Sequence, residues 1–288
     1  MMRRESASAY GFLAFPLAVI FVFTLVPSVA GLLLSLFVWD GSGWPVFVGT
    51  RNFQALAADA RFWPALRNTL AYVAGTVPAT VVLGFLLAAA VHARWFVGKT
   101  LCRTVFFLPT IVAIVAIGFV WRWVLNDQAG LAPSMLRAIG VTPPNLLQEG
   151  PWPMISIVVV SIWRGVGFCM VLYLAAMSNV SESLYEAAEV DGASRAESLR
   201  YITWPQVAPM TAFLAVTGVI GALQVFDIVL VMTTAEVESG STNVLNWYVY
   251  REFKAGRYGY AATLGAVVFA LTLAATLAQL RLMRRSHA

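Results

Sequence analysis

Six long apolar runs are spaced along the 288-residue chain, and they constrain its fold more than any other feature. They lie near residues 12–38, 66–91, 104–125, 153–177, 206–234 and 259–282. A helix of about 20 apolar residues crosses the ~30 Å hydrocarbon layer of a membrane, and each run reaches that length. Closed barrels also satisfy their backbone in lipid, but these runs lack the alternation of barrel strands. The sequence therefore predicts an all-α polytopic membrane protein of about six transmembrane helices, folded as one transmembrane domain over residues 1–288.

The composition agrees with lipid as the solvent. Hydrophobic residues make up 60% of the chain and charged residues only 11%, whereas a soluble domain carries about a quarter charged residues. Arg3 and Arg4 precede the first run as in a secretory signal, but a signal's apolar core is only about 7–15 residues long, so we interpret the run as a retained anchor. The net charge of +5 suits anionic membrane lipid, and no base-stacking pattern points to nucleic acid.

The distribution of Lys and Arg between the runs indicates an orientation. With the N-terminus inside, ten of these residues fall on the cytoplasmic side and seven on the outside. The loop at 92–103 and the C-terminal tail are basic and carry no acid, which is typical of cytoplasmic segments. We therefore expect both the N-terminus and the C-terminus in the cytoplasm.

Catalytic and cofactor chemistry has little support in the sequence. The two cysteines and two histidines are scattered, so we expect no catalytic group, no metal and no cofactor. Gly98-Lys99-Thr100 ends like a phosphate-binding P-loop, but Ala93 stands at the position of its first glycine and no strand precedes it. Lys99 is better explained as a positively charged anchor at the membrane surface.

The loop at 178–205 is the polar interruption of the chain. Ser183 and Glu186 have capping-box spacing, and Ser194 and Glu197 repeat it, so we expect two short helices. The turn between them is expected at Asp191-Gly192, since glycine adopts positive φ freely. The residues alone leave two interpretations open: a solvated hairpin with acids on its wet face, or a docking element for another protein.

The following run resembles the EAA motif of permease subunits of binding-protein-dependent ABC importers: Glu186-Ala187-Ala188-Glu189-Val190-Asp191-Gly192-Ala193, then Ile202-Thr203-Trp204-Pro205. In that family the motif is a cytoplasmic helical hairpin that docks into a cleft of the ATPase subunit. The resemblance implies that the ATPase-docking residues are Glu186, Ala187, Ala188, Asp191, Gly192, Ala193 and Pro205.

The resemblance extends from about residue 10 to the C-terminus and is nearest to the carbohydrate-type, MalF/UgpA-like permeases. It rests on the order and spacing of short motifs: Trp39-Asp40-Gly41, Asn52-Phe53, Asn68-Thr69-Leu70, Phe107-Leu108-Pro109, Phe226-Asp227 and Tyr248-Val249-Tyr250. Two departures, Leu199 and Trp204, keep bulk and apolarity, so docking is expected to survive them. Ala235-Glu236-Val237-Glu238 replaces a common Gly-Gly-Pro and puts details of the external loop in doubt.

Polar residues inside the expected spans are candidates for a translocation path, because a charge at the bilayer centre costs ~2.5–3.5 kcal/mol. A helix over 206–234 places Thr217, Gly221, Gln224 and Asp227 on one face. This stripe suits the hydroxyl groups of a sugar. An ion pair between Asp227 and Arg164, acting as a structural lock, is the competing interpretation, and Arg164 is also a candidate for the cavity lining.

Together these observations predict one permease subunit of an ATP-driven importer in a bacterial inner membrane, for a carbohydrate or a glycerol-phosphate-like solute. The resemblance implies a second homologous permease, an ABC ATPase dimer and an extracellular solute-binding protein as partners, with ATP hydrolysis confined to the ATPase. Two alternatives remain: a proton-coupled secondary transporter that uses Asp227, and an integral membrane enzyme.

Overall fold

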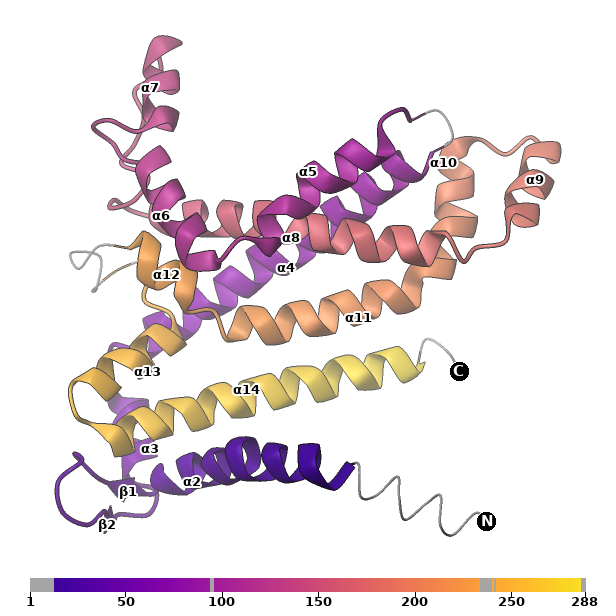
Figure 1. The fold of residues 1–288 in the computed structure, drawn as a ribbon. Helices are drawn as coiled ribbons and strands as arrows, with labels where there is room; N and C mark the ends of the chain where they lie inside the picture. Colours follow the sequence, from indigo (N-terminus) through magenta and orange to yellow (C-terminus); the bar gives the residue numbers. More distant parts are fainter. Residues whose placement is uncertain (1–12, 94–95, 234–239, 241, 286–288) are drawn as a thin grey trace, which may run out of the picture. The chain divides into compact units, whose positions relative to one another are not determined.

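The computed structural model describes residues 13–93, 96–233, 240 and 242–285, and these form two compact units (Figure 1). Unit 1 contains the described residues up to Phe62 together with Tyr248–Ala270, and unit 2 contains Trp63–Trp247 and the residues from Leu271 onward. Arg3, Arg4 and the stretch Ala235–Glu238, which entered the sequence argument, lie outside the described residues.

Unit 1 begins with an apolar helix, Leu13–Leu34, that contains a π-helical turn, η1 (Phe21–Leu25), and continues as α2 (Val26–Leu34). An antiparallel hairpin of β1 (Phe37–Val38) and β2 (Val46–Phe47) follows, then α3 (Arg51–Ala58). The unit is completed by most of α13 (Leu245–Lys254) and the first half of α14 (Tyr258–Arg285).

Side chains from distant segments donate hydrogen bonds to the backbone carbonyl groups that follow the first helix of unit 1. Asn52 donates from Nδ2 to the carbonyl oxygens of Ser35, at 2.9 Å, and Phe37, at 2.8 Å. Thr263 on α14 donates to the same Ser35 oxygen at 3.1 Å. Gly259 permits this approach, since a Cβ there would collide with the Phe37 carbonyl. Buried backbone acceptors need such partners, which explains why a polar Asn52 is almost fully buried.

Unit 2 holds the remaining helices. They are α4 (Phe62–His92, of which Phe62 belongs to unit 1), α5 (Lys99–Ile111), α6 (Ile114–Val124), α7 (Leu131–Ala138), α8 (Trp152–Met177), α9 (Glu182–Val190), α10 (Arg195–Ser198), the π-helical turn η2 (Leu199–Thr203), α11 (Trp204–Leu223) and α12 (Asp227–Met232). Both α5 and α11 pack against α8, and α12 packs against α6 (Figure 1). Helix α8 is therefore the centre of this unit.

The core of unit 2 lies along α8. Tyr173 is fully buried, and its hydroxyl donates to Thr211 of α11 at 2.9 Å. Its ring meets Phe85 of α4 edge-on, with the ring centroids 5.5 Å apart. Asn68 of α4 donates to the carbonyl oxygen of Asn243 at 3.1 Å, and this hydrogen bond holds the backbone just before α13 against α4.

The expected spans differ from the observed helices in three places. Within the described residues, five helices are long and apolar enough to cross a membrane, and a sixth span requires α5 and α6 together. That pair is bent by 100°, because Val112 and Ala113 are extended, so the run at 104–125 is not one straight helix. The run at 206–234 is interrupted after Leu223, and the run at 12–38 ends as helix at Leu34.

Candidate functional site

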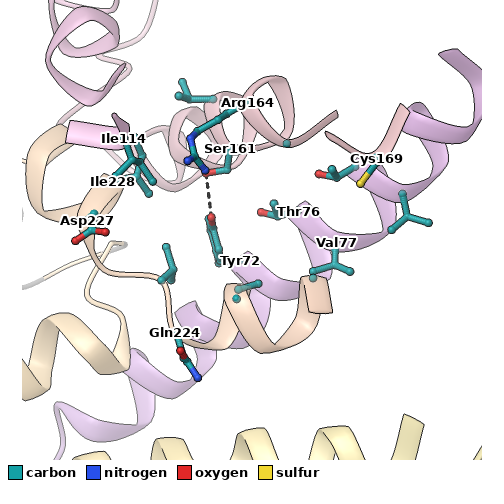
Figure 2. Close-up of a pocket in the computed structure, with 18 of the residues that line it drawn as sticks. Tyr72, Thr76, Val77, Ile114, Ser161, Arg164, Cys169, Gln224, Asp227 and Ile228 are labelled. Atoms are coloured by element: carbon teal, nitrogen blue, oxygen red, sulfur yellow. Dashed lines mark hydrogen bonds between the residues drawn. The ribbon is translucent and has the colours of Figure 1, made fainter. Parts of the chain in front are cut away.

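A cavity of about 340 Å³ lies inside unit 2, between α4, α8 and the interrupted segment that joins α11 to α12 (Figure 2). Its lining is largely aliphatic, with a small set of polar side chains. Ligand cavities typically have this composition, and their volumes run from about 300 to 1,000 Å³. The polar set consists of Tyr72, Thr76, Thr80, Ser161, Arg164, Gln224 and Asp227.

Tyr72 and Arg164 converge on one side of this cavity. The Tyr72 hydroxyl donates to Ser161 Oγ at 2.9 Å, and Figure 2 shows Arg164 reaching the same region from α8. Arg164 Nε is buried and has no hydrogen-bond partner among the described residues. A buried donor without a partner costs free energy, so a ligand acceptor at this position would be stabilised. The backbone of Arg164 is held separately, since its carbonyl oxygen accepts from Thr110 of α5 at 3.0 Å.

Asp227 and Gln224 lie away from Arg164, at the break between α11 and α12 (Figure 2). Gln224 follows the last residue of α11, and Asp227 is the first residue of α12. The single helical face expected for these two residues is therefore not formed, because the helix that would carry it ends at Leu223. No ion pair within 4.0 Å joins Asp227 to Arg164, so the structural lock is absent from the described residues.

Four of the five path candidates nonetheless line this cavity: Arg164, Gly221, Gln224 and Asp227. Thr217 does not, since its hydroxyl is exposed elsewhere on α11 and donates to the Phe213 carbonyl at 2.8 Å. Because the helix breaks after Leu223, Gln224 and Asp227 line the cavity from two helix ends and not from one helical face.

Sequence reasoning missed the polar face of α4. Tyr72, Thr76 and Thr80 are four residues apart and all line the cavity. Residues at this spacing share one face of a helix, so a hydroxyl-bearing stripe in an apolar span was a signal available in the sequence. Ser161, three residues before Arg164, completes the same wall from α8.

A second interruption, the bend between α5 and α6, borders the same cavity as the break beside Asp227. Helices α12 and α6 pack closely, and a Cβ on Gly118 of α6 would lie 2.8 Å from Val231 Cγ1 of α12. Ile114 at the start of α6 and Asp227 at the start of α12 both line the cavity. Irregular backbone at membrane depth is tolerated where it is buried in protein or borders a cavity, and both interruptions meet this condition.

The second feature is the polar segment at 178–205, which begins with α9. Asp191 caps the C-terminus of α9, and Gly192 follows with φ of +76°. The Gly192 N–H donates to the Glu189 carbonyl at 3.1 Å, and the Ala193 N–H donates to Ala188 at 2.9 Å. This pair of bonds is a Schellman motif, which favours glycine at its left-handed position. The turn predicted at Asp191-Gly192 is confirmed.

One of the two predicted capping boxes is present. Ser194 caps α10, its Oγ accepts from the Glu197 N–H, and Glu197 accepts from the Ser194 N–H at 2.7 Å. The box predicted at Ser183 and Glu186 is wrong, because α9 already begins at Glu182 and Ser181 is its N-cap. Ser183 instead shares a 2.7 Å hydrogen bond with the Ser181 hydroxyl.

The second helix of the segment continues into the membrane span instead of ending before it. Arg195–Leu223 is one helix of 29 residues, with the π turn η2 just before Pro205. Pro205 has no N–H, and the Trp204 N–H bonds the Leu199 carbonyl five residues back, so the wider turn accommodates the proline. Tyr185 of α9 and Thr203 share a 2.9 Å hydrogen bond, which ties α9 to this helix.

The docking candidates of this segment are mostly on its surface. Glu186, Ala187, Asp191 and Gly192 are exposed, Ala188 and Ala193 are partly buried, and Pro205 is exposed on α11. Val190 is 88% exposed, an apolar side chain among carboxylates with nothing covering it. The surface of α9 thus offers small, acidic and apolar groups together.

Comparison with known proteins identifies the family. The family model described as binding-protein-dependent transport system inner membrane component matches residues 80–287. This chain belongs to that family. It is a multi-pass membrane permease subunit of an ABC importer.

The similarity to known permeases covers almost the whole chain. The lactose transport system permease protein LacF of Rhizobium radiobacter is 32% identical over 93% of this chain and 91% of its own length. The trehalose/maltose transport system permease protein MalF of Thermococcus litoralis is 28% identical, over 98% and 95%. A crystal structure of a bacterial ABC transporter that imports the acidic polysaccharide alginate contains a chain with a TM-score of 0.88 and 25% identity, covering 98% of this permease and 96% of that chain.

Proposed function

We propose that this permease carries a carbohydrate or a related polyol through the cavity of unit 2. The observation that supports this most is the mixed lining: an unpartnered guanidinium donor at Arg164, a carboxylate at Asp227 and hydroxyl groups between aliphatic walls. A polyhydroxylated solute both donates and accepts hydrogen bonds, so it fits such a lining. Relatives named for lactose and for trehalose and maltose favour the same class.

The same proposal gives the segment at 178–205 the role of docking on the ATPase. Its acidic and apolar surface on α9 is uncovered, and its turn depends on Gly192. Because Arg195–Leu223 is a continuous helix, a force applied near Gly192 reaches Gly221 and Gln224, which border the cavity. ATP-driven closure of the ATPase would thereby tilt α11 and change access to the cavity.

The complete importer on this proposal contains a second homologous permease, an ABC ATPase dimer and an extracellular solute-binding protein. The alginate transporter crystallised with a periplasmic binding protein is a precedent for the last of these. ATP hydrolysis then takes place in the partner subunit, and the two units of this chain work as one permease domain in a bacterial inner membrane. Both termini and the docking segment lie in the cytoplasm.

The experiment that tests this function is affinity purification of the tagged permease from its native membrane, followed by uptake assays in vesicles with the recovered partners. We expect an ATPase and a second permease to be recovered, and uptake of a saccharide to require ATP. Uptake that persists without ATPase and is abolished by Asp227→Asn would contradict the importer and support a proton-coupled carrier.

A further inference from the structure

Unit 1 contains a second cavity, of about 510 Å³. Trp39 and Asp40 from the turn of the β1–β2 hairpin, Asn52 and Asp59 from the α3 region, and Tyr260 from α14 line it. Its volume lies in the range of about 300–1,000 Å³ that is typical of small-molecule sites. A cavity of this size lined by aromatic and charged side chains therefore calls for an occupant.

The charged wall of this second cavity is held rigidly. Arg61 donates to both carboxylate oxygens of Asp59, each at 3.2 Å, and the hydroxyls of Tyr248 and Tyr260 donate to Asp59 Oδ2. Burial raises the pKa of Asp59, but the hydrogen bonds from Arg61 and the tyrosines outweigh it and hold the pKa well below its usual range. Asp59 thus stays ionised and in place, while the Arg61 side chain is still 54% exposed.

Glu252 supplies a buried carboxylate with unused acceptor capacity. The residue is fully buried and lines the second cavity, and its Oε2 accepts from Arg257. Its Oε1 lies 3.6 Å from Arg251 Nη2 and makes no hydrogen bond. Two carboxylate oxygens offer about four acceptor positions, so a buried oxygen without any hydrogen bond is unusual. Glu252 therefore adds negative charge to the wall of the second cavity, and its ion pairs with Arg251 and Arg257 hold it in place.

Trp39 supplies an aromatic wall. Its indole N–H donates to the Gly43 carbonyl at 3.2 Å, and its ring centroid lies 5.4 Å from that of Tyr258, so the ring is held from two sides. Next to it, Asp40 is oriented by hydrogen bonds from the backbone N–H and the hydroxyl of Ser42. A rigid aromatic ring beside planar guanidinium and carboxylate groups fits the apolar C–H face and the paired hydroxyls of a sugar ring.

We propose that this cavity is a second saccharide-binding site, one that holds a neutral mono- or disaccharide. With α5 and α6 counted together as one span, residues 35–61 and 233–257 connect spans one to two and five to six, whereas 178–194 connects spans four to five, which puts the two loops on opposite sides of the membrane. The physiological meaning rests on the proposed function, since such a site would receive the solute before it enters the translocation path.

The test measures binding of methyl α-glucoside and maltose to the full chain in lipid nanodiscs by saturation-transfer NMR. Trp39→Ala is expected to weaken binding about fivefold, the effect of losing one aromatic contact, and Trp39→Phe to restore most of it. Trp44→Ala is the matched control, because Trp44 lies in the same hairpin turn, is 92% exposed and does not line the cavity.

Each outcome decides the proposal. Weaker binding in Trp39→Ala with unchanged binding in Trp44→Ala supports the site. Absence of saccharide binding by the wild type, or equal loss in Trp39→Ala and Trp44→Ala, overturns it. The proposed function is tested separately. If saccharide binding depends on Trp39 but the purified assembly takes up no saccharide, the transport role is refuted and the binding site is not.

Discussion

The docking segment at 178–205 and the cavity of unit 2 are built in opposite ways. The turn at Gly192 is made by hydrogen bonds among residues no more than five apart, and its surface faces solvent. The cavity joins α4, α8 and the start of α12, so its polar residues come from positions as far apart as Tyr72 and Asp227. The first region is formed by local hydrogen bonds, and the second exists only when the helices are packed. One continuous helix, Arg195–Leu223, connects them.

The largest expected effect comes from Gly192→Val. The residue has φ of +76° in open space, so valine meets no neighbour but adopts a backbone conformation that β-branched residues avoid. The Schellman turn then opens, and we expect ATP-driven uptake to fall by about 100-fold or more while membrane insertion is unchanged. Reconstituted uptake and the amount of ATPase recovered with the tagged chain measure this.

Gly140→Val is the matched control for this change. Gly140 has φ of +81° and also has nothing within 4 Å of the added Cβ, but it follows α7, outside the docking segment. The same backbone strain there is expected to leave uptake near the wild-type rate. Equal losses in both variants would show that general destabilisation, and not docking, explains the effect at Gly192.

The next effect tests the cavity. Asp227→Asn keeps the size of the side chain and removes its charge at the start of α12, where it lines the cavity without an ion pair to Arg164. We expect uptake to fall about tenfold, the worth of one charge-assisted hydrogen bond, with the complex assembled normally. Thr217→Val on the outer side of α11 should change uptake little. Failure of Asp227→Asn to assemble would instead assign Asp227 a structural role.

A smaller effect is expected from Pro205→Ala, which tests the connection between the two regions. Alanine restores an N–H and allows the π turn η2 to shorten to regular α-helix. The α9 end, held through the Tyr185–Thr203 hydrogen bond, then rotates relative to α11. We expect uptake to fall about threefold to tenfold with the ATPase still bound. Loss of the ATPase from the purified complex would place Pro205 in the docking contact itself.

The smallest effect is expected from Ser194→Ala, which removes the observed capping box of α10. Loss of an N-cap frees the first turn of a helix, so amide exchange at 195–198 should rise about fivefold while uptake changes little. Ser183→Ala is the comparison, because Ser183 does not cap α9, and its exchange should stay near that of the wild type. A large fall in uptake for Ser194→Ala would contradict this ranking.

The local region could be predicted from the sequence more fully than the cavity. Gly192 and the Ser194 box follow from short-range chemistry, and both were found where the sequence indicated. The capping box at Ser183 was wrong because α9 begins at Glu182, which places Ser183 inside its first turn. The break after Leu223 was missed because the residues from 225 to 232 are apolar except for Asp227, and periodicity cannot distinguish a continuous helix from two packed pieces. Its cause is tertiary: α12 packs on α6, itself separated from α5 by a sharp bend.

On the proposed function, the docking segment and the cavity are coupled through the helix Arg195–Leu223. The direct test is the labelling rate of Gly221→Cys, in a chain whose Cys102 and Cys169 are replaced by alanine, within the assembled importer with and without ATP. We predict that ATP changes this rate, that Gly192→Val abolishes the change and that Gly140→Val preserves it. A rate that ATP does not alter, or an ATP response that survives Gly192→Val, would contradict the coupling.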